Sequence, residues 1–348
     1  MVENFKLLGG FSMHSSVKQI SRRDFFKIMA LSGYFLAQPQ KMLFANEQPF
    51  GIMDFKFRTM SVKHLPEIQN KMDQVLNSGK VSQNETFQSY IKDRKFQLPE
   101  NFQDAKTIIV VAKFTNAATV NFNYNGKKYP TYIPPQYWDD GTTLDALTEE
   151  VQKQVIKSKE YKLEIARGFF MKRLATSCGL AKYGRNNIAY VDEYGTFITL
   201  FTFLTDWESP EDHYTEVQQL DLCDTCNLCL TQCPTGAIRK EEFIIDVSKC
   251  ATLYNETDAA FPEDMPKSVH DSLMGCMQCQ KKCPYKAKVM EHLTILEDIS
   301  EEDTEKILTG KWNTEKMKSV AEKLNEYYPA TDEEYFPVFT KNLGVLIN

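Results

Sequence analysis

The fold of this chain is decided by two cysteine runs, Cys223-Asp-Thr-Cys226-Asn-Leu-Cys229-Leu-Thr-Gln-Cys233-Pro234 and Cys276-Met-Gln-Cys279-Gln-Lys-Lys-Cys283-Pro284. The first run has the C-x2-C-x2-C-x3-C-P spacing of bacterial iron–sulfur proteins. The second run matches the last three cysteine positions of that spacing and lacks the first. Cys250 is the only cysteine between the runs and can fill the missing position. Because four thiolates hold one [4Fe-4S] cube, these cysteines predict two cubes.

The chain is expected to cross over between the two cubes. In two-cluster proteins the cysteine that precedes the proline ligates the other cluster. This rule divides the cysteines into two sets. The first cysteine set comprises Cys223, Cys226, Cys229 and Cys283. The second cysteine set comprises Cys233, Cys250, Cys276 and Cys279. We expect the two cubes to lie close enough for an electron to pass between them.

Two other uses of clustered cysteines fit less well. Zinc ribbons use two C-x2-C pairs, but they need neither the third cysteine nor the x3-C-P ending. Disulfide frameworks are typical of small secreted domains, and a chain of 348 residues does not need one. The ninth cysteine, Cys178, stands beside a glycine outside both runs, and we expect it to be a small buried hydrophobe.

The composition is that of a folded protein of about two domains, at roughly 150 residues per domain. Hydrophobic residues make up 42% and charged residues 25% of the chain, which is ordinary for a globular protein. The formal net charge is −6, and no long basic run interrupts the sequence. This acidity argues against a nucleic-acid partner.

The first fifty residues differ from the rest and predict export. Ser21-Arg22-Arg23-Asp24-Phe25-Phe26-Lys27 matches the twin-arginine signal, and a short apolar stretch, Ile28 to Ala37, follows it. An ordinary basic amphipathic helix is the alternative. The signal predicts a location in the periplasm or at the outer face of the cytoplasmic membrane. Whether the segment is cleaved or stays as a membrane anchor is open, because no convincing cleavage site follows.

Hydrophobic periodicity predicts several elements before the cysteines. Ser61 to Gly79 has helical spacing, and Asn84 to Arg94 is a second short helix. Ile108 to Ala112 is a buried strand. Thr115 to Asp140 is expected to be a long irregular connection rich in Tyr, Trp and Pro. Its rings would either stack on a flat ligand or pin the loop to the protein.

Further elements follow along the chain. Leu144 to Ala175 is expected to form one long helix, or two helices joined near Gly168. A hairpin is expected next, with strands Ile188 to Val191 and Thr196 to Leu204. Beyond the cysteines, two surface helices are expected, Glu301 to Leu308 and Thr314 to Tyr327.

Several segments besides the cysteines resemble the epoxyqueuosine reductase and reductive dehalogenase superfamily. They are Gly179-Leu180-Ala181-Lys182-Tyr183-Gly184-Arg185-Asn186, Tyr194-Gly195-Thr196-Phe197 and Leu204-Thr205-Asp206. The resemblance covers roughly residues 166–286, about a third of the chain. The long gap between Cys250 and Cys276 is more like the queuosine enzymes. The twin-arginine signal is more like the respiratory dehalogenases, which work outside the cytoplasm, whereas the queuosine enzymes do not.

The resemblance implies an α+β fold class: a nitroreductase-like α/β cobalamin-type domain followed by a two-[4Fe-4S] ferredoxin-like domain. The expected boundaries are 1–50 for the signal and linker, 51–215 for the α/β domain, 216–295 for the cluster domain and 296–348 for a C-terminal helical extension. The implied cofactors are two [4Fe-4S] clusters and cobalamin. The resemblance also suggests residues for the site. The expected catalytic residues are Tyr183, Arg185 and Glu164, and the expected cofactor-binding residues are Gly179, Gly184 and Asn186.

The leading functional prediction is a reductive dehalogenase-like oxidoreductase. Electrons would pass through two clusters to cobalamin, which would dehalogenate or deoxygenate a small-molecule substrate. The electron donor would be a redox protein or a membrane quinol-linked donor, with membrane association through an anchor partner or the uncleaved signal. One alternative is an exported double-cluster electron-transfer protein without cobalamin. Another is an epoxyqueuosine reductase-like enzyme that modifies tRNA.

Overall fold

The computed structural model describes residues 43–44, 50–51, 53–138, 141–240, 243–286, 290, 293–310, 320, 323–324 and 335–348. The predicted twin-arginine segment lies outside these residues. No helix within the described ranges is long and apolar enough to cross a membrane.

The main sheet has four antiparallel strands in the order β2-β3-β9-β6. Their bounds are β2 (Phe55–Ser61), β3 (Thr107–Phe114), β9 (Ile198–Thr205) and β6 (Leu163–Ile165). All eight residues of β3 are buried, which confirms the strand predicted from its β-branched run. A strand that is buried on both faces lies at the centre of its sheet, and β3 is paired on both sides.

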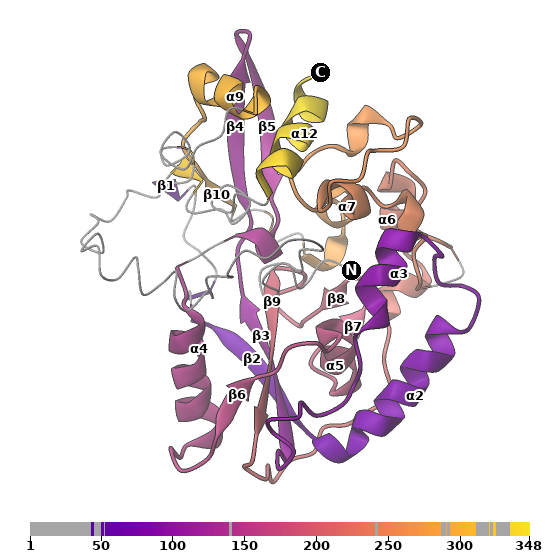
Figure 1. Cartoon of the computed structure of the whole chain (residues 1–348), viewed down its shortest axis with the longest axis vertical. Coiled ribbons are helices and arrows are strands. Elements are labelled where there is room, and N and C mark those ends of the chain that lie inside the picture. The colour runs from indigo at the N-terminus through magenta and orange to yellow at the C-terminus, as the bar shows by residue number, and fades with distance from the viewer. Residues whose placement is uncertain are drawn as a thin grey trace, which may run out of the picture.

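Helices cover both faces of this sheet, with α4 (Leu144–Val151) on one side and α2 (Leu65–Leu76) and α5 (Met171–Ser177) on the other (Figure 1). Successive side chains of β3 point to opposite faces of the sheet, which explains the two layers of helices. Ile108 and Val110 pack with α2 and α5, whereas Ile109 and Val111 pack with α4. Each such buried side chain contributes about 1.5–3 kcal/mol to stability.

Both helices predicted near the N-terminal end of the described chain are confirmed. In α2 the residue Glu67 lies in the first turn, where a negative charge favours the helix dipole. The second helix, α3 (Glu85–Lys92), is capped by Asn84, whose side chain accepts a hydrogen bond from the Phe87 N–H at 3.2 Å.

A second sheet replaces the irregular loop that was predicted between residues 115 and 140. Its order is β1-β10-β4-β5, with β1 (Leu43–Phe44), β10 (Thr294–Ile295), β4 (Ala118–Tyr124) and β5 (Lys127–Ile133). The loop prediction is wrong because Asn125 and Gly126, with φ of 49° and 67°, make a two-residue hairpin turn. The signal was present in the sequence, since Asn-Gly stands between two alternating segments.

The aromatic rings that follow this hairpin are not free to stack on a flat ligand. Tyr137 and Trp138 are only 1% and 3% exposed and belong to a core shared with the C-terminal region. The rings of residues 115–140 were predicted either to stack on a ligand or to pin the chain to the protein. Tyr137 and Trp138 do the second.

The C-terminal region packs against the β4–β5 hairpin. In Figure 1, α9 (Glu301–Leu308) and α12 (Phe336–Ile347) flank the hairpin at one end of the molecule. Phe122 of β4 and Phe339 of α12 meet edge to face, with ring centroids 6.4 Å apart. The predicted helix Glu301 to Leu308 is confirmed. The predicted helix Thr314 to Tyr327 falls mostly outside the described residues.

Two predictions in the middle of the chain are wrong. The predicted long helix is interrupted: α4 ends in a π-helical turn, and the edge strand β6 separates it from α5. Lys157 has a φ of 61° and terminates the turn. The predicted hairpin also fails, because β9 pairs with β3 and β6, whereas β8 (Ala189–Tyr190) pairs with β7 (Lys182–Tyr183). The local turn itself forms, since Val191 and Gly195 exchange two backbone hydrogen bonds, of 2.9 and 2.7 Å. Beyond this turn, however, β9 pairs with the buried β3.

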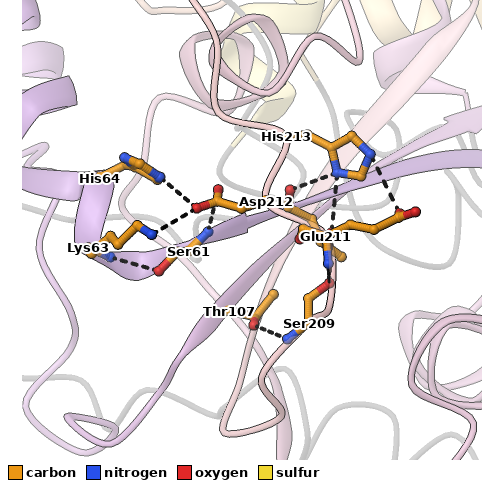
Figure 2. Close-up of polar contacts among 9 residues, drawn as sticks. Ser61, Lys63, His64, Thr107, Ser209, Glu211, Asp212 and His213 are labelled. Atoms are coloured by element: carbon orange, nitrogen blue, oxygen red, sulfur yellow. Dashed lines mark hydrogen bonds and ion pairs between the residues drawn. The ribbon is translucent and has the colours of Figure 1, made fainter.

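The segment that leads from β9 toward the cysteines is fastened to the edge of the main sheet (Figure 2). Asp212 accepts a hydrogen bond from the Ser61 N–H at 3.2 Å, and its other carboxylate oxygen lies 2.8 Å from Nε2 of His64. Burial alone would raise the pKa of Asp212, but bonds from His64, Ser61 and Lys63 lower it to about 2. The carboxylate therefore holds this segment in place as an anion.

Candidate iron–sulfur site

The cysteines lie on loops that run into very short helices. These are α6 (Leu228–Gln232), α7 (Ala251–Asn255) and α8 (Gln278–Lys281). Cys229 lies in α6 and Cys279 in α8, and the two helices pack against each other. The packing brings the two runs together, although they are far apart in the sequence.

The first cysteine set lines one hollow, part of it open to solvent. Cys283 comes from the second run and still faces the same hollow as Cys223, Cys226 and Cys229. Burial, together with the neighbouring thiols of this set, raises the pKa of Cys229 to about 11. Since iron binds the thiolate, a cluster would offset this repulsion and release protons on binding. Four thiols around one hollow fit a [4Fe-4S] cube.

The second cysteine set is half-buried, as the first set is. Burial raises the pKa of Cys279, and the thiols of Cys250 and Cys233 add to the effect. Burial also raises the pKa of Cys276, with further contributions from Asp271, Cys279 and Cys250. These mutual effects show that the second set also gathers in one place. Within the described residues, no three Cys, His, Asp or Glu side chains are spaced to hold a single metal ion.

Arg185, a predicted catalytic residue, lies beside the first cysteine set. It is 7% exposed and lines the hollow. Its guanidinium donates hydrogen bonds to the backbone oxygens of Cys223 and Lys240 and lies 5.3 Å from the ring centroid of Phe243. These contacts tie the first cysteine loop to the segment that follows it.

The other two predicted catalytic residues do not line this hollow. Tyr183 lies in β7, where its backbone N–H donates to Gln218 and its carbonyl accepts from Leu220, each at 2.9 Å. Glu164 lies on the edge strand β6 and pairs with Lys162 at 2.8 Å. The structure brings Arg185 to the cysteines but not Glu164.

The three predicted cofactor-binding residues contact protein groups. Gly179, with a φ of 67°, follows α5 where the helix ends. A Cβ on Gly184 would lie 2.7 Å from Oδ1 of Asn186 and would overlap the ring of Tyr190. Asn186 donates to Tyr190 Oη at 3.0 Å. Because these residues are engaged with protein groups, their contacts do not favour the predicted role in holding a corrinoid.

Tyr190 is a site residue that the sequence reasoning missed. Its hydroxyl donates to Sγ of Cys283 at 3.4 Å. Burial raises the pKa of Tyr190 well above its usual value, and the thiol of Cys283 raises it further, so the phenol keeps its proton. No local pattern marks this residue, because its partner is 93 positions away in the chain.

Cys178 is a core residue, as predicted. It is 1% exposed, and burial raises the pKa of its thiol to about 12. Its Sγ donates to the carbonyl of Ala175 at 3.5 Å. A thiol in this position is unreactive at neutral pH.

Comparison with known proteins supports the iron–sulfur interpretation. Residues 222–286 match the family described as the 4Fe-4S double cluster binding domain. Epoxyqueuosine reductase from Escherichia coli is 32% identical over 154 residues, which cover 43% of this chain and 39% of that protein. The enzyme from Lactococcus garvieae is 24% identical over 208 residues, or 58% of this chain and 57% of that protein. The chain thus matches less than two thirds of the length of these relatives.

Solved structures share the fold over more of the chain. Epoxyqueuosine reductase from Streptococcus thermophilus superposes with a TM-score of 0.55 at 16% identity, covering 84% of this chain and 76% of that one. An epoxyqueuosine reductase crystallised with a tRNA-Tyr epoxyqueuosine-modified stem loop gives a TM-score of 0.55 at 17% identity, covering 85% and 77%.

These comparisons correct the leading functional prediction. The prediction of a reductive dehalogenase-like function is wrong, because the relatives and structural neighbours are epoxyqueuosine reductases. The findings favour the tRNA-modifying alternative instead. The cysteine spacing is common to both enzyme classes and was unable to separate them.

Two further predictions are corrected with it. The exclusion of a nucleic-acid partner is wrong, because a neighbour of this fold was crystallised with a tRNA stem loop. Net charge sums over the whole chain, whereas binding depends on a local surface. The predicted export is wrong on the same comparisons, because the relatives and structural neighbours are epoxyqueuosine reductases. Residues 222–286 thus match a 4Fe-4S double cluster binding domain, and the chain has the mixed α/β fold seen in epoxyqueuosine reductase structures.

Proposed function

We propose that this chain is an iron–sulfur oxidoreductase that reduces the epoxide of epoxyqueuosine in tRNA. The observation that carries the proposal is the hollow formed by the first cysteine set, in a fold shared with epoxyqueuosine reductases. The first cysteine set holds one [4Fe-4S] cube and the second cysteine set holds the other. The domain boundaries at residues 51–215, 216–295 and 296–348 remain part of the proposal.

The two cubes match the electron count of the reaction. Removal of an epoxide oxygen breaks two C–O bonds, forms a C=C bond and releases water, which consumes two electrons and two protons. Each cube carries one electron at a time, so a reduced pair supplies both electrons. The first hollow is partly open to solvent, which suits electron entry.

Cobalamin remains a prediction from the family resemblance. When bound, it would supply a two-electron centre between the clusters and the substrate. The contacts of Gly179, Gly184 and Asn186 do not favour it. Tyr183 and Glu164 likewise remain proton donors proposed from the family resemblance alone, because neither residue lines the hollow.

The proposal is tested with the full chain, reconstituted anaerobically with iron and sulfide. Reduced protein is incubated with tRNA that carries epoxyqueuosine, and the nucleosides are measured by mass spectrometry. We expect conversion to queuosine, and we expect its loss in Cys276→Ser. Cys178→Ser is the matched control, because this thiol lies in the hydrophobic core and belongs to neither set. Full cluster content and reducibility with no conversion, with or without added cobalamin, would contradict the proposal.

A second candidate is an electron-transfer protein that performs no chemistry on a nucleoside. The observation in its favour is that the residues expected to face a corrinoid contact protein groups instead. Such a protein would pass electrons rapidly to a partner redox protein and leave epoxyqueuosine unchanged. Stopped-flow oxidation of the reduced clusters, run beside the tRNA assay, separates the two candidates.

A further inference from the structure

Two buried polar side chains, Asn186 and Tyr190, lie between the two cysteine sets, with 4% and 3% of their surface exposed. The Tyr190 hydroxyl lies 3.4 Å from Sγ of Cys283, in the first cysteine set. Nδ2 of Asn186 lies 3.7 Å from Sγ of Cys279, in the second cysteine set. The same amide nitrogen donates to Tyr190 Oη at 3.0 Å. The pair forms one hydrogen-bonded bridge with a sulfur of each set at its ends.

The surrounding chain holds this bridge in one geometry. The turn before Tyr190 is closed by two backbone bonds of 2.9 Å, from Gly184 N–H to the Ile188 oxygen and from Asn187 N–H to the Gly184 oxygen. Gly184 leaves the space that both side chains fill. The ring of Tyr285 packs edge-on against Tyr190, with centroids 5.5 Å apart. The bridge is therefore pre-organised by close packing and backbone bonds.

Donors at a cluster sulfur change the energy of the cluster. A reduced cube carries one more negative charge than an oxidised cube, so a donated hydrogen bond stabilises the reduced form more and raises the reduction potential. The effect is stronger in a buried site, where the dielectric constant is low. The amide N–H of Asn186 also polarises the hydroxyl of Tyr190, which strengthens the bond to Cys283.

We propose that Asn186 and Tyr190 are positioning residues that set the potentials of the two clusters relative to each other. Tyr190 acts on the first cluster through Cys283, and Asn186 acts on the second cluster through Cys279. The transfer that they tune moves one electron from the first cluster to the second, so the first is oxidised and the second reduced. This inference rests on the proposed cluster ligands and is independent of the proposed tRNA substrate.

The test is a redox titration of the reconstituted full chain, followed by electron paramagnetic resonance. Tyr190→Phe removes only the hydroxyl, and we expect the reduced-to-oxidised ratio of the first cluster to fall several-fold at a fixed potential. A tenfold fall corresponds to a shift of 59 mV for a one-electron couple. Asn186→Leu keeps the branched shape of the side chain and removes the amide donor. We expect it to lower the potential of the second cluster.

Tyr285→Phe is the matched control. It removes a hydroxyl from the neighbouring ring, but this hydroxyl donates to the carboxylate of Asp192 and not to a sulfur. We expect both potentials to stay unchanged. Unaltered potentials in Tyr190→Phe and Asn186→Leu at full iron content would overturn the proposal.

A measurement on the unmodified protein covers the case in which a variant loses its cluster. In D₂O, electron–nuclear double resonance should detect an exchangeable deuteron coupled to each reduced cluster, from the hydroxyl of Tyr190 and the amide of Asn186. The absence of such a coupling overturns the proposal. Iron content and reduction potentials are measured without tRNA. A failure of the proposed reductase activity can therefore be distinguished from a failure of this proposal.

Discussion

Gly184 and Tyr190 face each other across the β7–β8 turn so closely that a Cβ on Gly184 would overlap the tyrosine ring. The same Cβ would lie 2.7 Å from Oδ1 of Asn186. The glycine is thus required by packing, since its φ does not lie in the left-handed region. Its absent side chain makes room for both members of the bridge between the cysteine sets.

Gly184→Ala should therefore disturb the cluster site from outside it. Overpacking of this kind costs about 1–3 kcal/mol, and here the cost falls on Tyr190 and Asn186. We expect lower iron content after reconstitution and a lower unfolding temperature. Gly126→Ala is the control, because it lies in an open turn with nothing near its Cβ position and a φ of 67°. An equal loss of iron in both variants would contradict this account.

Cys250→Ser should remove one cluster and leave the other. Cys250 is grouped with the second cysteine set, where its thiol raises the pKa values of Cys276 and Cys279. We expect the variant to retain about half of the iron, because four thiolates hold each cube. Spectra of the reduced variant should show the first cluster alone. Loss of the cluster at Cys223 with retention of the other would refute the assignment.

Glu256 should make stability fall as pH rises. Burial raises the pKa of this carboxyl to about 8, although a hydrogen bond from the Tyr137 hydroxyl opposes the shift. The folded state keeps a proton that the unfolded state releases near pH 4.5, so stability is fully present below that pH. It is lost progressively as pH rises to about 8, by on the order of a few kcal/mol.

Glu256→Gln tests this dependence, because the amide is neutral at every pH and can still bond to Tyr137. Unfolding temperatures measured across this range should fall with pH in the wild type and stay nearly flat in the variant. Parallel curves for the two proteins would show that another group is responsible.

Asp212 should make stability fall as the pH falls, the reverse of the effect of Glu256. Its pKa is lowered from 3.8 to about 2. Its contribution to folding stability is therefore fully present above pH 3.8 and is lost as the pH falls through about 2. The side chain is partly exposed, which limits the contribution to about 1 kcal/mol. We expect Asp212→Asn to lower the urea midpoint at neutral pH, with a difference that shrinks in acid. Glu211→Gln, in an exposed pair with His213, should change the midpoint little.

Local patterns in the sequence determined several parts of this protein correctly. Helical spacing predicted α2, the helices α3 and α9 were predicted from their short local segments, and a β-branched run predicted β3. The spacing of the cysteines predicted a two-cluster domain, which the family match at residues 222–286 supports. These signals succeed because each depends on residues that are close together in the chain. The β4–β5 hairpin was equally local, and its Asn125-Gly126 turn was overlooked.

Only the tertiary structure decided the contacts that build the site. The pairing of β9 with β3, the packing of α6 against α8 and the bond from Tyr190 to Cys283 join distant segments. No local spacing encodes such contacts, because they follow from the burial of whole faces of the sheet and its helices. The sequence by itself therefore determined which cysteines are available for clusters. The fold decided which side chains surround them.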